Sequence, residues 1–242
     1  MATDSIAISQ PSLPTPKSTV AGAWHTIFLL ALVTAWSAWG YFGTVRMRTA
    51  QNPHRAASYA LTILWEWSLV AYIAWGAKRH GSSLRELIGG KWNDSKSFLK
   101  DIAIAAGFWL IALAVLFATA LALRADKPGP SMRFLFPQSH LEIVLWILTS
   151  LTAGICEEII FRGYFQRQFI AWSGSVPAGV LLSAAVFGAV HTYQSGKSAI
   201  IIAVYGLLFG ILAEMRKSLR PGMMTHAWHD GFVGLAGRLL VK

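Results

Sequence analysis

Long apolar runs of about 20 residues, nearly free of charge, follow one another along this chain of 242 residues. A helix of ~20 residues, rising 1.5 Å per residue, crosses the ~30 Å hydrocarbon core of a bilayer. Hydrophobic residues make up 55% of the chain and charged residues only 13%. The sequence therefore predicts an all-α fold, a polytopic bundle of transmembrane helices. We expect about seven spans, at approximately 22–44, 56–77, 101–123, 141–161, 175–193, 198–214 and 222–241.

The formal net charge is +10, which in a soluble protein would suggest nucleic acid. Here the basic residues lie mostly in loops between apolar runs and form no basic-aromatic stripe, so we predict contact with the lipid bilayer and no nucleic acid. The loop at 78–100, rich in Lys and Gly, is the strongest signal for a cytoplasmic segment. We expect residues 162–173 on the same side, projecting out of the membrane. The single cysteine, Cys156, excludes an internal disulfide.

Ionisable residues inside apolar spans are costly in hydrocarbon, at least ~2.5 kcal/mol each when unpaired, and therefore mark candidate functional sites. Glu66, in "LWEWS", is one such residue, and it either pairs with another helix or lines a cavity. The others gather in the last 90 or so residues: Glu157, Glu158, Arg162, His191, His226, His229 and Asp230.

Two adjacent carboxylates, Glu157 and Glu158, open the stretch "EEIIFR". Glu158 and Arg162 are four residues apart, so they share a helical face and are expected to pair. Glu157 is rotated by ~100° from Glu158 and points elsewhere. We therefore expect a structural role for Glu158 and chemistry for Glu157.

His191 lies 34 residues after Glu157, and Gly174, in "WSGS", is at the midpoint. A helical hairpin with its turn at Gly174 would bring Glu157 and His191 to the same depth. A carboxylate beside an imidazole can bind and deprotonate a water molecule. The alternative is that two core residues simply satisfy each other.

His226 and Asp230, in "THAWHDG", are also four apart on one face. They could stabilise a developing oxyanion or orient one another. An ionised Asp only accepts hydrogen bonds, so Asp230 is expected to orient His226 rather than to donate. His229 lies within one turn of His226. It could belong to the same site, or it could equally make a buried polar contact between helices.

Three motifs in this order give the sequence a resemblance to a known family, the type II CAAX prenyl proteases and bacteriocin-processing (abortive-infection-like) intramembrane endopeptidases. They are E-E-x-x-x-R at Glu157, Glu158 and Arg162, F-x-x-x-H at Phe187 and His191, and H-x-x-x-[ND] at His226 and Asp230. The resemblance covers about 141–235. It divides the chain into a disordered tail at 1–20, variable N-terminal transmembrane helices at 21–140, and a CAAX-protease-like catalytic core at 141–242.

The resemblance implies an endopeptidase that cuts a membrane-associated peptide or protein in a cavity open to the cytosol. Glu157 and His191 would activate water, His226 and position 230 would stabilise the oxyanion, and Phe187 would pack beside the site. Many family members have Asn at position 230, and Asp here puts the oxyanion role of Asp230 in doubt. The expected location is a bacterial plasma membrane, with several passes through it.

Other functions remain open on sequence alone. Glu157, His191, His226 and His229 have ligand-type side chains, so a zinc-dependent membrane protease is an alternative, although no H-E-x-x-H is present. We expect a mechanism without a cofactor. A catalytically silent membrane scaffold or immunity protein would use the same polar cluster only to hold helices together. A transporter has little support, since the spans show no internal repeat.

Overall fold

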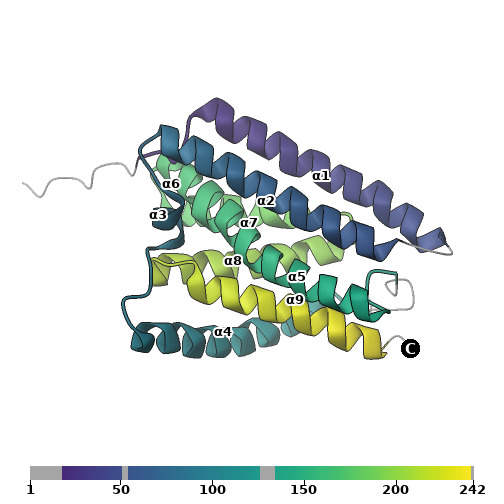
Figure 1. Ribbon diagram of the computed structural model, residues 1–242. Coiled ribbons are helices and arrows are strands. Elements are labelled where there is room, and N and C mark those ends of the chain that lie inside the picture. Colours follow the sequence, from purple (N-terminus) through teal and green to yellow (C-terminus); the bar gives the residue numbers. More distant parts are fainter. Residues whose placement is uncertain (1–17, 51–53, 126–133, 241–242) are drawn as a thin grey trace, which may run out of the picture.

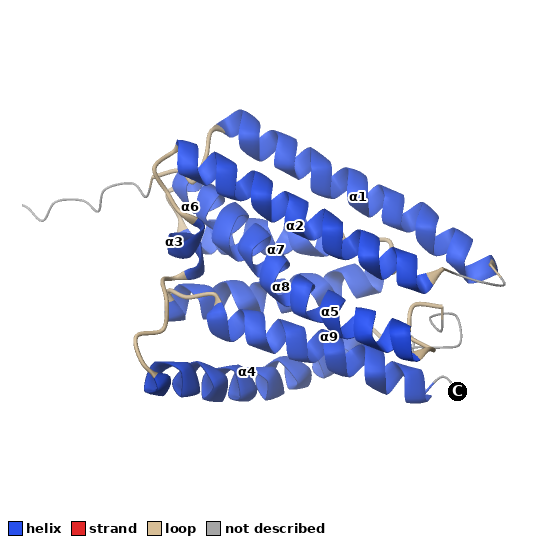
Figure 2. Cartoon of the chain, viewed as in Figure 1, coloured by secondary structure: helices blue, strands red, loops and turns tan. Residues whose placement is uncertain are grey.

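The computed structural model describes residues 18–50, 54–125 and 134–240, and in these ranges every regular element is a helix (Figures 1 and 2). This confirms the all-α prediction. The predicted tail falls mostly at 1–17, outside the described residues. The helices are α1 (Ala23–Thr49), α2 (Arg55–Arg79), α3 (Leu84–Ile88), α4 (Ser95–Ala122), α5 (His140–Glu157), the π-helix η2 (Glu158–Gln166), α6 (Arg167–Ser173), α7 (Val176–Ala189), α8 (Gly196–Arg216) and α9 (Arg220–Leu240).

In the part of the chain that the structure describes, five helical stretches are long and apolar enough to cross a membrane, and α5, η2 and α6 together form one of them, His140–Ser173. The other four are α1 to Met47, α2, α4 and α8. The two remaining predicted spans correspond to α9 and to α7, which has only 14 residues. At 1.5 Å per residue α7 is ~21 Å long, short of the ~30 Å core, because a turn at 190–195 ends it. About seven spans is thus roughly what the structure contains.

The outer surface of the bundle is apolar, as expected for helices in contact with lipid. Large exposed apolar side chains occur on α1, α2, α4 and α8, among them Trp24, Leu64, Phe117 and Met215. Monomeric soluble proteins rarely expose so much apolar surface. The chain is therefore an integral, multi-pass membrane protein.

The central rod, α5 with η2 and α6, packs against α2, α7 and α9 (Figure 1). Gly154 allows α5 and α9 to approach closely, because a Cβ there would lie 2.7 Å from the backbone nitrogen of Ala227. Gly174, with φ of 67°, ends α6 in the left-handed region and turns the chain into α7. The hairpin predicted at Gly174 is therefore confirmed.

Segments predicted to lie on the inner side gather at one end of the bundle, at the left of Figure 1. Arg167 donates to the carbonyls of Glu86 and Leu87, and the amide of Leu219 donates to Ile88. These contacts join α3 to α6 and to the loop before α9. The three segments therefore share a side of the bundle, and which side of the membrane that is stays a prediction.

Two glutamines within residues 162–173 make their hydrogen bonds inside the protein. Gln166 and Gln168 are fully buried in protein contacts. Gln168 bonds to the backbone of Val20 and Ala21, and Gln166 donates to the carbonyl of Gly210. Their amides satisfy the backbone of neighbouring segments, a use that composition alone does not reveal.

Candidate active site

Glu158 and Arg162 form a buried ion pair at the centre of the molecule. Nη1 of Arg162 lies 3.0 Å from Oε1 of Glu158, and both side chains are 1% exposed. Nη2 of Arg162 donates to the carbonyl oxygen of Gly206 on α8 at 3.2 Å. The guanidinium also lies over the ring of Phe187, 4.4 Å from its centroid. The predicted pairing is confirmed, and it ties η2 to α7 and α8.

The π-helical winding of η2 begins at Glu158, directly after Glu157. A π-helix is rare, and short stretches of it frequently occur at functional sites. Here the π-helix follows the close contact of α5 with α9 at Gly154. The face that carries Glu158 and Arg162 is turned towards α8. Sequence periodicity gave no sign of this winding, since the apolar run continues through it.

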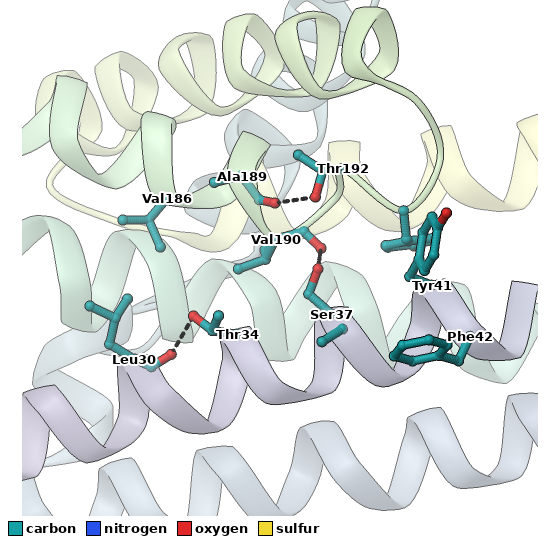
Figure 3. A pocket seen from close by; sticks show the side chains of 11 residues that line it. Leu30, Thr34, Ser37, Tyr41, Phe42, Val186, Ala189, Val190 and Thr192 are labelled. Atoms are coloured by element: carbon teal, nitrogen blue, oxygen red, sulfur yellow. Dashed lines mark hydrogen bonds between the residues drawn. The ribbon is translucent and has the colours of Figure 1, made fainter.

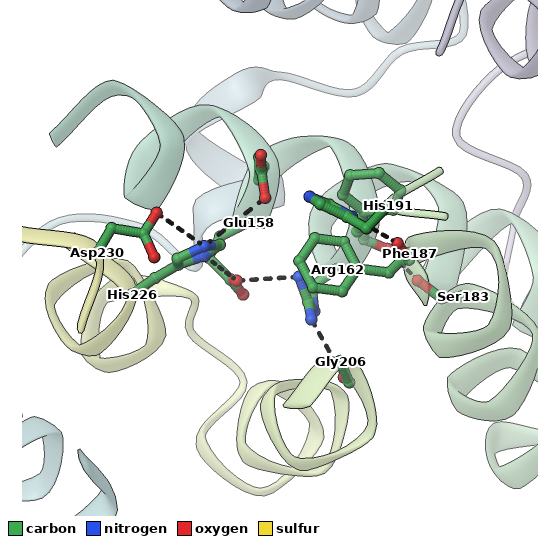
Figure 4. Close-up of polar contacts among 10 residues, drawn as sticks. Glu158, Arg162, Ser183, Phe187, His191, Gly206, His226 and Asp230 are labelled. Carbon is green, nitrogen blue, oxygen red and sulfur yellow. Dashed lines mark hydrogen bonds and ion pairs between the residues drawn. The ribbon is translucent and has the colours of Figure 1, made fainter. Parts of the chain in front are cut away.

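His226, on α9, is buried among three carboxylates (Figure 4). Its Nδ1 lies 3.1 Å from Oε1 of Glu158. Its Nε2 lies 3.6 Å from Oε2 of Glu157 and 3.6 Å from Oδ2 of Asp230. An ionised carboxylate only accepts, so Nδ1 must carry the proton that bonds Glu158. Glu158 therefore orients His226 and turns Nε2 towards the other two carboxylates.

The role of Asp230 towards His226 stays a prediction. The i, i+4 spacing does bring Asp230 beside His226, at 3.6 Å from Nε2, which is longer than a hydrogen bond. The hydrogen bond that fixes the ring is donated by Nδ1 of His226 to Glu158. The backbone carbonyl of Asp230 accepts from Nε1 of Trp146 at 3.0 Å, which anchors this part of α9 to α5.

His191 follows the last turn of α7, on the other side of Arg162 from His226 (Figure 4). Its Nδ1 donates to the backbone carbonyl of Phe187 at 2.7 Å, because a carbonyl oxygen can only accept. Nε2 of neutral His191 is then an acceptor. Phe187 is buried between His191 and Arg162, as the resemblance implied for a packing residue. The direct approach of Glu157 to His191 stays a prediction.

The ionisable side chains of this site differ in their exposure to solvent. The side chains of Glu158 and Arg162 are 1% exposed, whereas those of Glu157 and Asp230 are 17% and 33% exposed. His191 is also partly exposed. Glu158 and Arg162 are therefore shielded from water, whereas Glu157, Asp230 and His191 are accessible to it.

Two polar groups beside His226 were missed or left undecided by sequence reasoning. The Tyr205 ring lies 5.7 Å from that of His226 and 5.0 Å from that of His229. Tyr205 Oη and His229 Nδ1 are both buried without a hydrogen-bond partner. Buried tyrosine hydroxyls usually find a partner. Tyr205 could have been noticed from sequence only as a phenol inside an apolar span.

Within the described residues, no group of three or more His, Cys, Asp and Glu side chains is placed to hold a metal ion. Nδ1 of His226 is engaged by Glu158, and its Nε2 faces two carboxylates at equal distance. Tetrahedral zinc requires three or four fixed protein ligands at ~2.0–2.3 Å. The side chains present do not form such a set.

A mainly apolar groove of about 520 Å³ lies between α1 and the end of α7 (Figure 3). Val190 and Thr192, the two neighbours of His191, are among its lining residues. Ser37 on α1 donates to the carbonyl of Val190 and holds this wall in place. The groove therefore runs beside the loop that carries His191.

Comparison with protein-family models gives a match over part of the chain. Residues 139–232 match the family model described as type II CAAX prenyl endopeptidase Rce1-like. The matched segment contains all three motifs and every residue of the cluster except Glu66. This agrees with the resemblance read from the motifs. No curated protein and no solved structure matches the chain.

Proposed function

We propose that this chain, whose residues 139–232 match the Rce1-like endopeptidase family model, hydrolyses a peptide bond in a membrane-associated substrate by a glutamate-activated water. The family match supports a membrane endopeptidase in general terms. The observation that supports the specific mechanism is the placement of His226, whose Nε2 is held between Glu157 and Asp230 by the bond from Nδ1 to Glu158.

Glu157 is the general base in this proposal. A water molecule bound by Glu157 and by Nε2 of His191 gives a proton to the Glu157 carboxylate while its oxygen attacks the peptide carbonyl carbon. Glu157 later returns that proton to the leaving amine as the carbon–nitrogen bond breaks. The partial exposure of both side chains supports access for water and substrate.

The tetrahedral intermediate needs donors for its oxyanion. Nδ1 of His226 already donates to Glu158, so donation from Nε2 requires the doubly protonated ring, which two facing carboxylates favour. Ionised Asp230 cannot donate. The buried, unpartnered hydroxyl of Tyr205, beside His226, is the candidate for a second donor in place of the Asn found in many family members.

The groove beside His191 supports a substrate that reaches the site from the bilayer. Its lining is mainly apolar, with Val186, Ala189 and Val190 from α7 and its end and Leu30 and Ala38 from α1. An apolar chain entering there would pass the loop that positions His191. This favours a membrane-anchored substrate over a soluble peptide.

The decisive test is Glu157→Gln, which keeps the shape of the side chain and removes the base. Membrane peptides from cells that express the wild type or the variant are compared by mass spectrometry, with folding checked by thermal unfolding in detergent. We expect loss of specific cleavage products with little change in unfolding temperature. The matched control is Glu86→Gln, which conserves the capping box of α3 and should cleave normally.

Normal cleavage by a folded Glu157→Gln protein would overturn the proposed base. It would also favour the alternative of a membrane scaffold, in which the polar cluster only holds helices together.

A further inference from the structure

Glu66, on α2, lies outside the matched domain but beside its site. The side chain is 7% exposed, and its Oε2 atom is buried without a hydrogen-bond partner. α2 packs directly on α5, the helix that ends in Glu157. A buried carboxyl oxygen without a partner is costly, and its persistence calls for an explanation.

The charged groups that act on Glu66 are those of the site. Glu157 is the strongest of them, followed by Asp230 on α9. Two further titratable groups, Cys156 on α5 and Tyr193 after α7, also interact electrostatically with Glu66. On α2, the preceding residue Trp65 stacks on Trp36 of α1 with ring centroids 4.8 Å apart. Glu66 is therefore a buried carboxyl group whose charged neighbours are those of the reaction site.

The balance of nearby charges determines whether the Glu66 carboxyl group is protonated. Four carboxyl groups meet in this region: Glu66, Glu157, Glu158 and Asp230. Arg162 neutralises Glu158, and His226 in its doubly protonated form balances one more. Two like charges would remain close together in a poorly solvated place, and such pairs retain a proton. Glu66, the most buried of the remaining three and the one without a cation beside its Oε2, is the group best suited to hold it.

We propose that Glu66 is a positioning residue of the peptidase site, a protonated carboxylic acid that donates a hydrogen bond towards the Glu157 carboxylate. The donated bond holds the Glu157 carboxylate in one orientation. Ionised Glu66 would instead repel Glu157 and push it out of position. The proposal rests on the proposed function of Glu157, and it extends the site to α2, beyond the matched segment.

Three variants test the hydrogen bond. Glu66→Gln keeps a donor and cannot ionise, so we expect kcat within about threefold of wild type at neutral pH. Glu66→Leu has no donor, and we expect kcat to fall by about 10- to 100-fold with little change in KM. Ser68→Leu, an exposed position on the same helix, removes a polar group away from the site and should leave kcat unchanged.

The pH profile separates positioning from a merely structural role. In the wild type, raising the pH until Glu66 loses its proton should lower the activity. Glu66→Gln has no such proton, so its activity should persist to higher pH. Cys156 and Tyr193 also titrate at alkaline pH, and Cys156→Ser and Tyr193→Phe controls should leave the shift between wild type and Glu66→Gln intact.

A spectroscopic measurement does not depend on activity. The infrared spectrum of wild type minus Glu66→Gln should contain the carbonyl stretch of a protonated carboxylic acid, shifted in heavy water. The band should remain in the Glu157→Gln protein, which separates this proposal from the proposed catalytic role of Glu157. The absence of the band, full activity in folded Glu66→Leu, or equal losses in Glu66→Gln and Glu66→Leu would each overturn it. Should Glu66→Leu not fold, the pH profile and spectrum of Glu66→Gln decide.

Discussion

Oε1 of Glu158 lies 3.1 Å from Nδ1 of His226, so one carboxylate oxygen orients the histidine from the far end of the matched domain. The same oxygen receives Nη1 of Arg162 at 3.0 Å. Glu158 thus joins two of the three motifs by direct bonds, and Arg162 reaches the third by lying over the ring of Phe187. The three motifs, which are separate in the sequence, are therefore connected by contacts in the structure. The buried residues Glu158 and Arg162 fix the orientation of the side chains around them.

Arg162→Ala should destabilise the protein strongly. The substitution removes the cation from Glu158, whose side chain is 1% exposed, and leaves the Gly206 carbonyl without its donor. We expect a loss of ~3–5 kcal/mol, seen as reduced folded yield and a lower unfolding temperature in detergent. Arg55→Ala is the matched control, because Glu142 keeps two backbone N–H donors and the cost there should be ~0–1 kcal/mol.

Equal stability of the Arg162→Ala and wild-type proteins would contradict a structural pair. In that case a large loss of activity with normal folding would assign Arg162 to substrate binding.

Asp230→Asn should retain activity or increase it, because the amide can donate where an ionised carboxylate cannot. Tyr205→Phe should lower kcat by ~10²- to 10³-fold, the usual effect of removing one oxyanion donor. If both groups serve the same oxyanion, Asp230→Asn should partly restore the Tyr205→Phe protein. Kinetics of the two single variants and the double variant measure this coupling. Full activity in Tyr205→Phe would remove Tyr205 from the oxyanion site.

The loop at 78–100 should be cytoplasmic. On a Cys156→Ser background, a cysteine at exposed Asn93 should be protected from an impermeant thiol reagent in intact cells. A cysteine at exposed Lys197, in the first turn of α8, should be labelled. Cys156 itself is fully buried and should react poorly even without replacement. The reverse labelling pattern would invert the topology and place the site's opening on the outer face.

Much of this architecture was predictable because it depends on local spacing. The apolar run lengths gave the helices, the i, i+4 rule gave the Glu158–Arg162 pair, and the turn signal at Gly174 gave the hairpin. Each of these follows from residues close in sequence or from a period of 3.6.

What could not be predicted depends on helix crossings. The bond from Glu158 to His226 exists because α5 and α9 approach closely at Gly154, and no local pattern states which helices meet there. Glu66 and Tyr205 gain their significance from neighbours on other helices in the same way. The burial of Gln168 also reflects tertiary contacts, with the segment before α1.

We expect activity without zinc, since Glu157 and His191 can activate water as a base and an acceptor. The ligand atoms do not suit a metal: His226 Nδ1 bonds Glu158, and Nε2 lies 3.6 Å from each of two carboxylates that stabilise its protonated form. The test is to strip the purified enzyme with a strong chelator, verify by elemental analysis that it is free of metal, and assay it. Retained activity is the expected result. Lost activity that returns with stoichiometric Zn²⁺ would turn Glu157, His191 and His226 into metal ligands and would give His229 a role beside them.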